Sequence, residues 1–149
     1  MVKRKIKMQK IRSLYLAHPW NMREFVRNWE LKIEKLYELN LDNPFYDHYT
    51  KEIEDVENNW IKNKRNKRIS KMIVEKDLRA IERNDGLIAF IEYSKHSLGT
   101  PMEIFYSGRI LQKPTFVISS NCGGHPWIKD LATKVFKDIN KFEDFIKFL

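Results

Sequence analysis

An acidic pair in the middle of the sequence has the residue types needed for glycosidic-bond chemistry. The stretch from Asp77 to Glu103 reads as a helix, a buried strand, a loop and a second helix, and Ser97 and Gly99 lie in the turn-forming segment before Glu103. Two carboxylates that converge on one crevice can divide the work, with one ionised as nucleophile and the other protonated as acid. The structural alternative makes Asp77 a surface helix residue and Glu103 a first-turn acid favoured by the helix dipole.

The segment near the first apolar stretch offers a second group of polar side chains. Residues 10–17 are expected to end in a strand, and Asn21 to cap the next helix, whose first N–H groups would form an anion site. Arg23 in that first turn opposes the helix dipole unless an anion faces it. His18 is either a substrate contact or a hydrogen-bonding residue of the loop. Tyr15 faces the pocket or turns away from it, and the period of the strand leaves both open.

Aromatic residues form a third group that would suit a nucleobase. Phe45 and Tyr46 lie in a segment, 42–47, whose Asn-Pro sequence predicts a loop, and Trp20 is expected opposite them. Stacking on a base and ordinary core filling account for these side chains equally well.

The sequence indicates neither a metal nor a cofactor. The histidines are not at ligand spacing from one another, and His125 beside Cys122 is too small a set for a metal site. Neither a Walker A nor a GxGxxG motif occurs. The four histidines are His18, His48, His96 and His125.

The composition is that of a soluble protein with anionic partners. The net charge is +8, with 42% hydrophobic and 32% charged residues. Nucleic acid is not favoured over a small anionic substrate, because the dense basic runs within 3–10 and 62–68 read as solvated segments. The single cysteine, Cys122, excludes an internal disulfide and points to the cytoplasm. We recognise no signal peptide and no run long enough to span a membrane.

Alternating strands and helices predict one α/β domain over residues 1–149, with a basic extension at 1–10. This pattern favours a flavodoxin- or Rossmann-like three-layer sandwich with a five-stranded parallel sheet in the order 2-1-3-4-5. We expect strands within 10–17 and at 39–41, 87–91, 114–119 and 134–136. We expect helices from 21 onward and at 48–62, 69–83, 101–111, 127–132 and 141–149.

Together these features resemble the nucleoside 2-deoxyribosyltransferase superfamily, which includes base-exchanging transferases and 2'-deoxynucleoside 5'-monophosphate N-glycosidases. The matching pieces are SLYLAHPW, DNPFYD, EKDLRAIERNDGLIAFIE and SLGTPMEIFYSGRILQKPTFV, spread over most of residues 13–117. The specific part of the match is the order and spacing of Asp77, Asp85, Ser97 and Glu103.

The resemblance implies a role for each matching side chain. Glu103 would attack C1' and form a glycosyl-enzyme intermediate, Asp77 would handle the proton of the leaving base, and Tyr15 would position the nucleophile. Ser97 stands where the transferases typically carry an aspartate and the monophosphate hydrolases a serine. A serine hydroxyl can donate to a 5'-phosphate that an aspartate would repel, which favours a nucleotide substrate.

Two positions depart from the family, and one partner is implied by it. The family usually has glycine and alanine two and four residues after the nucleophile, where this chain has Phe105 and Ser107. We expect Phe105 to alter how closely its helix packs on the sheet. The family also implies a homodimer, with C-terminal residues of a neighbouring subunit reaching the site, and we assign Asn121 to that position.

The leading prediction is an N-glycosidase for 2'-deoxynucleoside 5'-monophosphates. A deoxyribosyltransferase is the alternative, because the choice of water or a second base as acceptor depends on water access to the closed site. A non-catalytic nucleotide-binding module and a nucleic-acid-binding protein acting through residues 62–68 are the other classes. The expected substrate-binding residues are Ser97, Gly99, His18, Trp20, Asn21, Arg23, Phe45 and Asn121, beside the catalytic Glu103, Asp77 and Tyr15.

Overall fold

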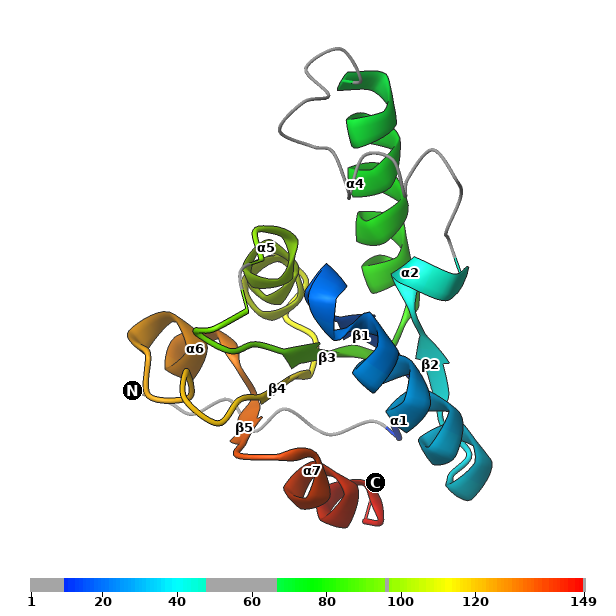
Figure 1. The fold of residues 1–149 in the computed structure, drawn as a ribbon, viewed down its shortest axis with the longest axis vertical. Helices are drawn as coiled ribbons and strands as arrows, with labels where there is room; N and C mark the ends of the chain where they lie inside the picture. The colour runs from blue at the N-terminus through cyan, green and yellow to red at the C-terminus, as the bar shows by residue number, and fades with distance from the viewer. Residues whose placement is uncertain (1–9, 48–66, 96, 149) are drawn as a thin grey trace.

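The fold is built on a parallel β-sheet whose strands are the apolar runs of the sequence. The computed structural model describes residues 10–47, 67–95 and 97–148. Its sheet has the order β2-β1-β3-β4-β5, with every pair parallel, which confirms the predicted order (Figure 1). The strands are β1 (Ser13–Ala17), β2 (Asn40–Asp42), β3 (Gly86–Phe90), β4 (Thr115–Ile118) and β5 (Lys134–Phe136).

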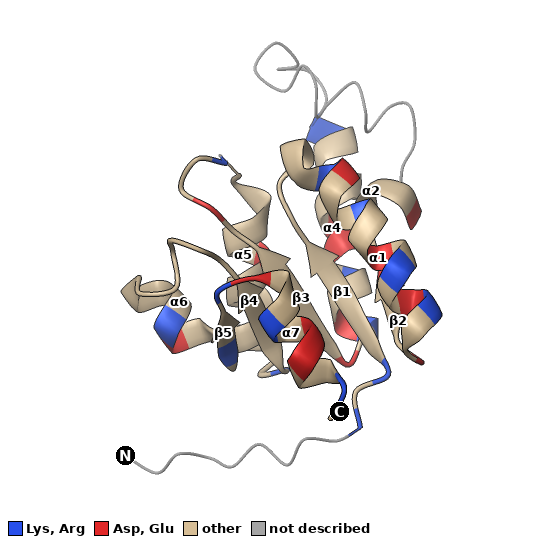
Figure 2. Ribbon diagram, turned by 60° about the horizontal axis from the view of Figure 1, so that its bottom comes forward, with Lys and Arg blue, Asp and Glu red and all other residues tan. Residues whose placement is uncertain are grey.

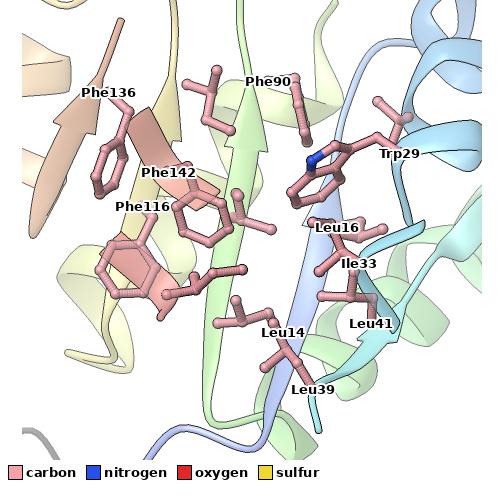
Figure 3. Close-up of a cluster of buried hydrophobic side chains, with 14 of the residues drawn as sticks. Leu14, Leu16, Trp29, Ile33, Leu39, Leu41, Phe90, Phe116, Phe136 and Phe142 are labelled. Carbon is pink, nitrogen blue, oxygen red and sulfur yellow. The ribbon is translucent and has the colours of Figure 1, made fainter. Parts of the chain in front are cut away.

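Helices cover both faces of this sheet, as the three-layer prediction requires. The face made by Leu14, Leu16 and Phe90 packs against two of the helices in an aromatic-rich core (Figure 3). Tyr15, Ala17 and the other alternate strand residues face three helices on the opposite side. The first layer holds α1 (Arg23–Leu36) and α7 (Ile139–Ile146), and the second holds α4 (Lys67–Arg83), α5 (Gly99–Phe105) and α6 (Pro126–Leu131).

Two local predictions near the first strand are wrong. Asn21 does not cap a helix: it lies in the 3-10 turn Trp20–Met22, and α1 begins at Arg23 after Met22, without a side-chain cap. The segment 42–47 is not all loop, since Pro44–Asp47 forms the short helix α2. Its start is held by Asn43, whose Oδ1 accepts the N–H of Phe45 at 3.2 Å. An asparagine side chain that bonds two residues ahead mimics a helical turn.

The helix that carries Glu103 also differs from its prediction. It begins two residues early, at Gly99, and continues from Tyr106 as a five-residue π-helix, η2 (Tyr106–Ile110). The wide π turn brings the backbone of Gly108 so close to α6 that a Cβ there would lie 2.5 Å from the carbonyl oxygen of Leu131. The expected helix 48–62 lies outside the described residues.

Phe105 does not separate its helix from the sheet. Its side chain is 38% exposed and its ring lies 6.5 Å from that of Trp127 on α6. Ser107 is buried instead, with its hydroxyl 2.8 Å from that of Thr115. The small side chain at 107 therefore allows close packing on β4, while Phe105 adds apolar surface on the outer side of α5.

Candidate active site

The sheet presents its ligand crevice at the carboxyl ends of β1 and β3. In a parallel sheet of this order the connections leave β1 and β3 in opposite directions, which opens a crevice between them. The two strands end side by side, with Ala17 paired to Ala89. The connections that follow β1, β2 and β3, with the helices that begin there, hold most of the residues that the sequence predicted for the site.

The three residues predicted to be catalytic, Tyr15, Glu103 and Asp77, lie close to one another. Tyr15 is fully buried, and its pKa is raised well above 10, first by burial and then by the negative charges of Glu103 and Asp77. Glu103 also raises the pKa as a hydrogen-bond acceptor for the phenol, although the contact falls short of full hydrogen-bond geometry. The phenol therefore stays protonated at neutral pH, between two acids on different helices.

Gly99 controls the room around the Glu103 carboxylate. The two residues are one helical turn apart on α5, and a Cβ at position 99 would lie 3.3 Å from Oε1 of Glu103. That contact is tighter than ordinary van der Waals separation, so a side chain there would displace the carboxylate by a few tenths of an ångström. Glycine at this position lets Glu103 lie over the first turn of its own helix.

Ser97 holds the start of α5. Its Oγ accepts the N–H of Thr100 at 3.2 Å and donates to the hydroxyl of Thr100 at 3.0 Å. Satisfying a first-turn N–H in this way is what a capping serine does. The side chain thus fixes the loop that leads to Glu103, and it adds no negative charge there.

Trp20 and Arg23 form a unit of their own beside the crevice. The guanidinium of Arg23 lies 4.0 Å from the centre of the Trp20 ring and donates to the Trp20 carbonyl at 3.0 Å. Asn21 between them is exposed. The predicted anion site at Asn21 is therefore displaced, because the helix starts two residues later and Arg23 is stacked on an aromatic ring.

Phe45 links that unit to His18. Its ring meets His18 edge-on at 4.9 Å and Trp20 edge-on at 5.1 Å. His18 is buried, and its Nδ1 lies 3.2 Å from the carbonyl oxygen of Leu16. Burial lowers the pKa of His18 to about 4, so the ring is neutral near pH 7. The structure thus brings together the predicted aromatic residues Phe45 and Trp20, while Tyr46 is exposed beneath Arg27.

Asn121 is not part of this group in the described contacts. It lies in the loop after β4, and its Oδ1 accepts the N–H of Tyr93 at 3.1 Å and a longer contact from the thiol of Cys122. It therefore ties the loop after β4 to the loop after β3.

Sequence reasoning missed Asp42 at the end of β2. This carboxylate is buried, accepts from Arg83 and Asn84 at 2.9 Å each, and contributes to the raised pKa of Tyr15. The signal was available, since an acid that ends a strand next to β1 lies at the same sheet edge as the other site residues.

Sequence reasoning also missed a pocket of about 650 Å³ between α5 and α6. Pro101, Met102 and Phe105 line it from the side of α5 that faces away from Glu103, since successive helical residues are about 100° apart. Ile104 and Ser97 also line it, so the pocket extends to the loop that opens α5. Buried Thr100, Ile104 and Ser107 mark the sheet-facing side of the helix. Its exposed apolar walls are Tyr93 (62%), Met102 (69%), Phe105 (38%) and Trp127 (64%).

Two negative findings apply to residues 10–47, 67–95 and 97–148. These ranges contain no group of three or more His, Cys, Asp or Glu side chains arranged to hold a metal ion. A helix with the length and hydropathy needed to cross a bilayer is also absent from them.

Comparison with known proteins gives a structural match. No family model and no curated protein sequence matches the chain. Among solved structures, it is similar to a 2-deoxyribosyltransferase from the psychrotolerant bacterium Bacillus psychrosaccharolyticus, with 22% sequence identity and a TM-score of 0.63. The match covers 89% of this chain and 90% of the transferase chain. The chain therefore has the fold of a 2-deoxyribosyltransferase over almost its whole length.

Proposed function

We propose that this protein cleaves the base–sugar bond of 2'-deoxynucleoside 5'-monophosphates through a covalent intermediate on Glu103. The observation that supports the proposal is the grouping of Glu103, Asp77 and Tyr15 at the ligand edge of this fold. The fold itself is shared with an enzyme whose name states that it transfers 2-deoxyribosyl groups.

The chemistry needs one ionised and one protonated acid. The carboxylate of Glu103 attacks C1' as the bond from C1' to the base nitrogen breaks, and Asp77 gives its proton to the leaving base. Water then attacks C1', its proton returns to Asp77, and the bond to Glu103 breaks. Tyr15 remains a neutral donor beside Glu103 throughout and positions the nucleophile.

The 5'-phosphate preference rests on the charge near Ser97. The serine hydroxyl closes the start of α5 and brings no negative charge that would repel a phosphate. The overall charge of +8 is consistent with an anionic substrate.

A deoxyribosyltransferase is the second candidate, and the structural match to a transferase favours it. In that reaction a second free base, rather than water, takes the sugar from Glu103. The two candidates share every step up to the covalent intermediate and differ only in the acceptor.

Nucleic acid is not the partner that the described surface suggests. Figure 2 shows that both basic and acidic residues occur on α1 and α4. The dense basic runs lie almost wholly outside the described residues.

A second copy of the chain is the partner that we propose for the pocket between α5 and α6. Its apolar walls continue from the outer side of the helix that carries Glu103. Exposed aromatic and Met side chains that cluster in this way mark interaction surfaces. Glu92 and Lys95 at its rim have opposite charges, which suits an interface between identical surfaces. Light scattering after gel filtration tests this, and a monomer at micromolar concentration would contradict it.

The proposed reaction is tested by resolving its products. Each deoxynucleoside and its 5'-monophosphate is incubated with the protein, with and without a second free base, and the products are separated. We expect free base and deoxyribose 5-phosphate from the monophosphates, and loss of at least about a thousandfold in rate for Glu103→Gln. Intact-mass measurement after acid quenching should show an added sugar phosphate on the wild type alone.

Each outcome is informative. New nucleosides formed only with added base would replace the hydrolase by the transferase. Full activity of Glu103→Gln would overturn the mechanism in both forms. Tight nucleotide binding with no base release would make the protein a non-catalytic binding module.

A further inference from the structure

One ring nitrogen of His18 is an acceptor for which the described residues supply no partner. The side chain is 3% exposed and follows β1 directly, three residues after Tyr15. Because a carbonyl oxygen only accepts, the contact from Nδ1 to Leu16 places the proton on Nδ1 and leaves a lone pair on Nε2. Nε2 is buried and has no hydrogen-bond partner in the described structure.

This arrangement carries a cost that the fold alone does not offset. A buried acceptor without a donor costs about 1–3 kcal/mol, and such groups are uncommon in native proteins. Protonation does not remove the problem, because burial, opposed only by the Leu16 carbonyl, holds the pKa of His18 at about 4. The ring therefore presents a fixed acceptor at physiological pH.

The surroundings of this acceptor suit a planar heterocycle. His18 and Trp20 both meet the ring of Phe45 edge-on. The guanidinium of Arg23 lies over the ring of Trp20. Aromatic edges and faces bind planar rings with little dependence on sequence or substituent. Discrimination between bases then has to come from polar atoms in the group, and Nε2 is the buried acceptor among them.

We propose that Nε2 of His18 accepts a hydrogen bond from an N–H group of the leaving base, and so selects bases that present such a donor. This inference rests on the proposed function, since the base is bound for cleavage at Glu103. Nε2 is closed to solvent in the structure, so a neighbouring ring must turn aside to admit the base. Phe45 is the neighbour that we assign, because it lies on the four-residue helix α2 and is only half-buried.

The first test compares substrates with analogues that lack the donor. The matched monophosphates carry adenine or purine, cytosine or 2-pyrimidinone, and thymine or 3-methylthymine. An analogue without the donor leaves the buried acceptor unsatisfied, so wild type should prefer the donor-bearing member of its best pair by about 10–100-fold in kcat/KM. His18→Phe should reduce that preference to less than about threefold, whereas His18→Gln, which keeps an acceptor, should retain most of it. A merely structural role would lower both members of a pair equally, and that result would overturn the inference.

The second test does not depend on turnover. In the Glu103→Gln background, the Nε2 resonance of His18 is followed by ¹⁵N NMR during titration with the same nucleotides. It should shift with the donor-bearing nucleotide and stay unchanged with its analogue. A shift without any base release in the wild type would uphold the acceptor role and refute the proposed reaction. Base release with neither a shift nor discrimination would refute the acceptor role and leave the reaction standing.

Discussion

The crevice at the end of β1 and the pocket between α5 and α6 both border α5, but they differ in which side chains are buried and which are exposed. In the crevice, polar groups are buried: Tyr15 and His18 are almost fully covered, and Glu103 reaches in from α5. In the pocket, apolar groups are exposed, with Met102 and Trp127 each about two-thirds accessible. Both depart from the usual distribution of side chains, in which buried groups are apolar and exposed ones polar.

The two departures point to different missing contacts. A buried donor or acceptor is stabilised by a ligand that supplies hydrogen bonds, and an exposed apolar surface by a partner that removes it from water. The simplest assignment is a small substrate in the crevice and a protein partner in the pocket, with Ser97 bordering both regions. Four measurements test this assignment, and the acid sensitivity of the fold should show the largest effect on free energy.

The burial of neutral His18 should make the protein sensitive to acid. In the unfolded chain the imidazole takes up a proton near pH 6.5, whereas the folded protein resists protonation until about pH 4. The contribution of neutral His18 to the free energy of unfolding is therefore fully present above pH 6.5. It decreases by about 3 kcal/mol as the pH falls through this window. The measurement is the free energy of urea unfolding between pH 7 and 4.

His18→Phe separates this effect from the titration of other groups. Its unfolding free energy should depend less on pH in that window than that of the wild type by the same amount. Parallel pH profiles for the two proteins would show that His18 is not a buried neutral group, and the contrast between the two regions would lose its main support.

Crowding the nucleophile should lower activity without unfolding the protein. Gly99→Ala places a methyl group 3.3 Å from Oε1 of Glu103, so we expect kcat to fall about 10–100-fold. The melting temperature should stay the same or rise, since alanine favours the helix. Gly124→Ala is the matched control, because a Cβ there has no atom within 4 Å. Equal activity of the two variants would show that the Glu103 carboxylate is not held in a working position.

Removing the buried phenol should cost less. Tyr15→Phe keeps the ring in the core but removes the neutral donor beside Glu103, and we expect kcat to fall about tenfold. Tyr106→Phe is the control, since it removes a hydroxyl that bonds Glu82 at an exposed position. Progress curves of base release for both variants give the comparison, and a larger effect at Tyr106 would contradict the assignment.

The pocket should respond in association rather than in stability. Met102→Ser with Phe105→Ser removes two exposed apolar side chains, and we expect the dissociation constant of the second copy to rise about tenfold or more. The unfolding free energy of the monomer should change by less than about 1 kcal/mol. Leu31→Ser with Leu36→Ser, two exposed positions on α1, should leave association unchanged. Analytical ultracentrifugation distinguishes these outcomes.

The sheet was predictable because its strands can be recognised in the sequence as short apolar runs. The run Gly86–Phe90 is apolar at every position, as a strand covered on both faces must be, and the alternation with helices indicates a parallel sheet. The grouping of Asp77 with Glu103 was predictable from the family resemblance and from the sheet edge they share. The oligomeric state, the localisation and the site roles stay predictions.

What the sequence analysis missed has both local and long-range causes. Asn21 is a residue type that often caps helices, yet it lies within the 3-10 turn that follows Pro19, and α1 begins only after that turn. Ser97 also accepts the N–H of Thr100, a contact that the sequence analysis did not anticipate, and its role in substrate binding stays a prediction. Asp42 joins the site only because β2 pairs with β1, and the outer apolar side of α5 becomes a pocket only when α6 packs beside it. Local patterns do not contain this information.

Lys113 fixes the C-terminal end of the helix that carries Asp77, the proposed acid. The ammonium of Lys113 bonds the carbonyl oxygens of Ile81, Glu82 and Asn84, which end α4 just before β3. Only this end of α4 is buried, and the remainder projects beyond the sheet (Figure 1). Asp77 lies on α4 about 9 Å along the helix axis from Arg83. A change that weakens the bonds of Lys113 would therefore shift the proposed acid relative to Glu103, although it touches neither residue.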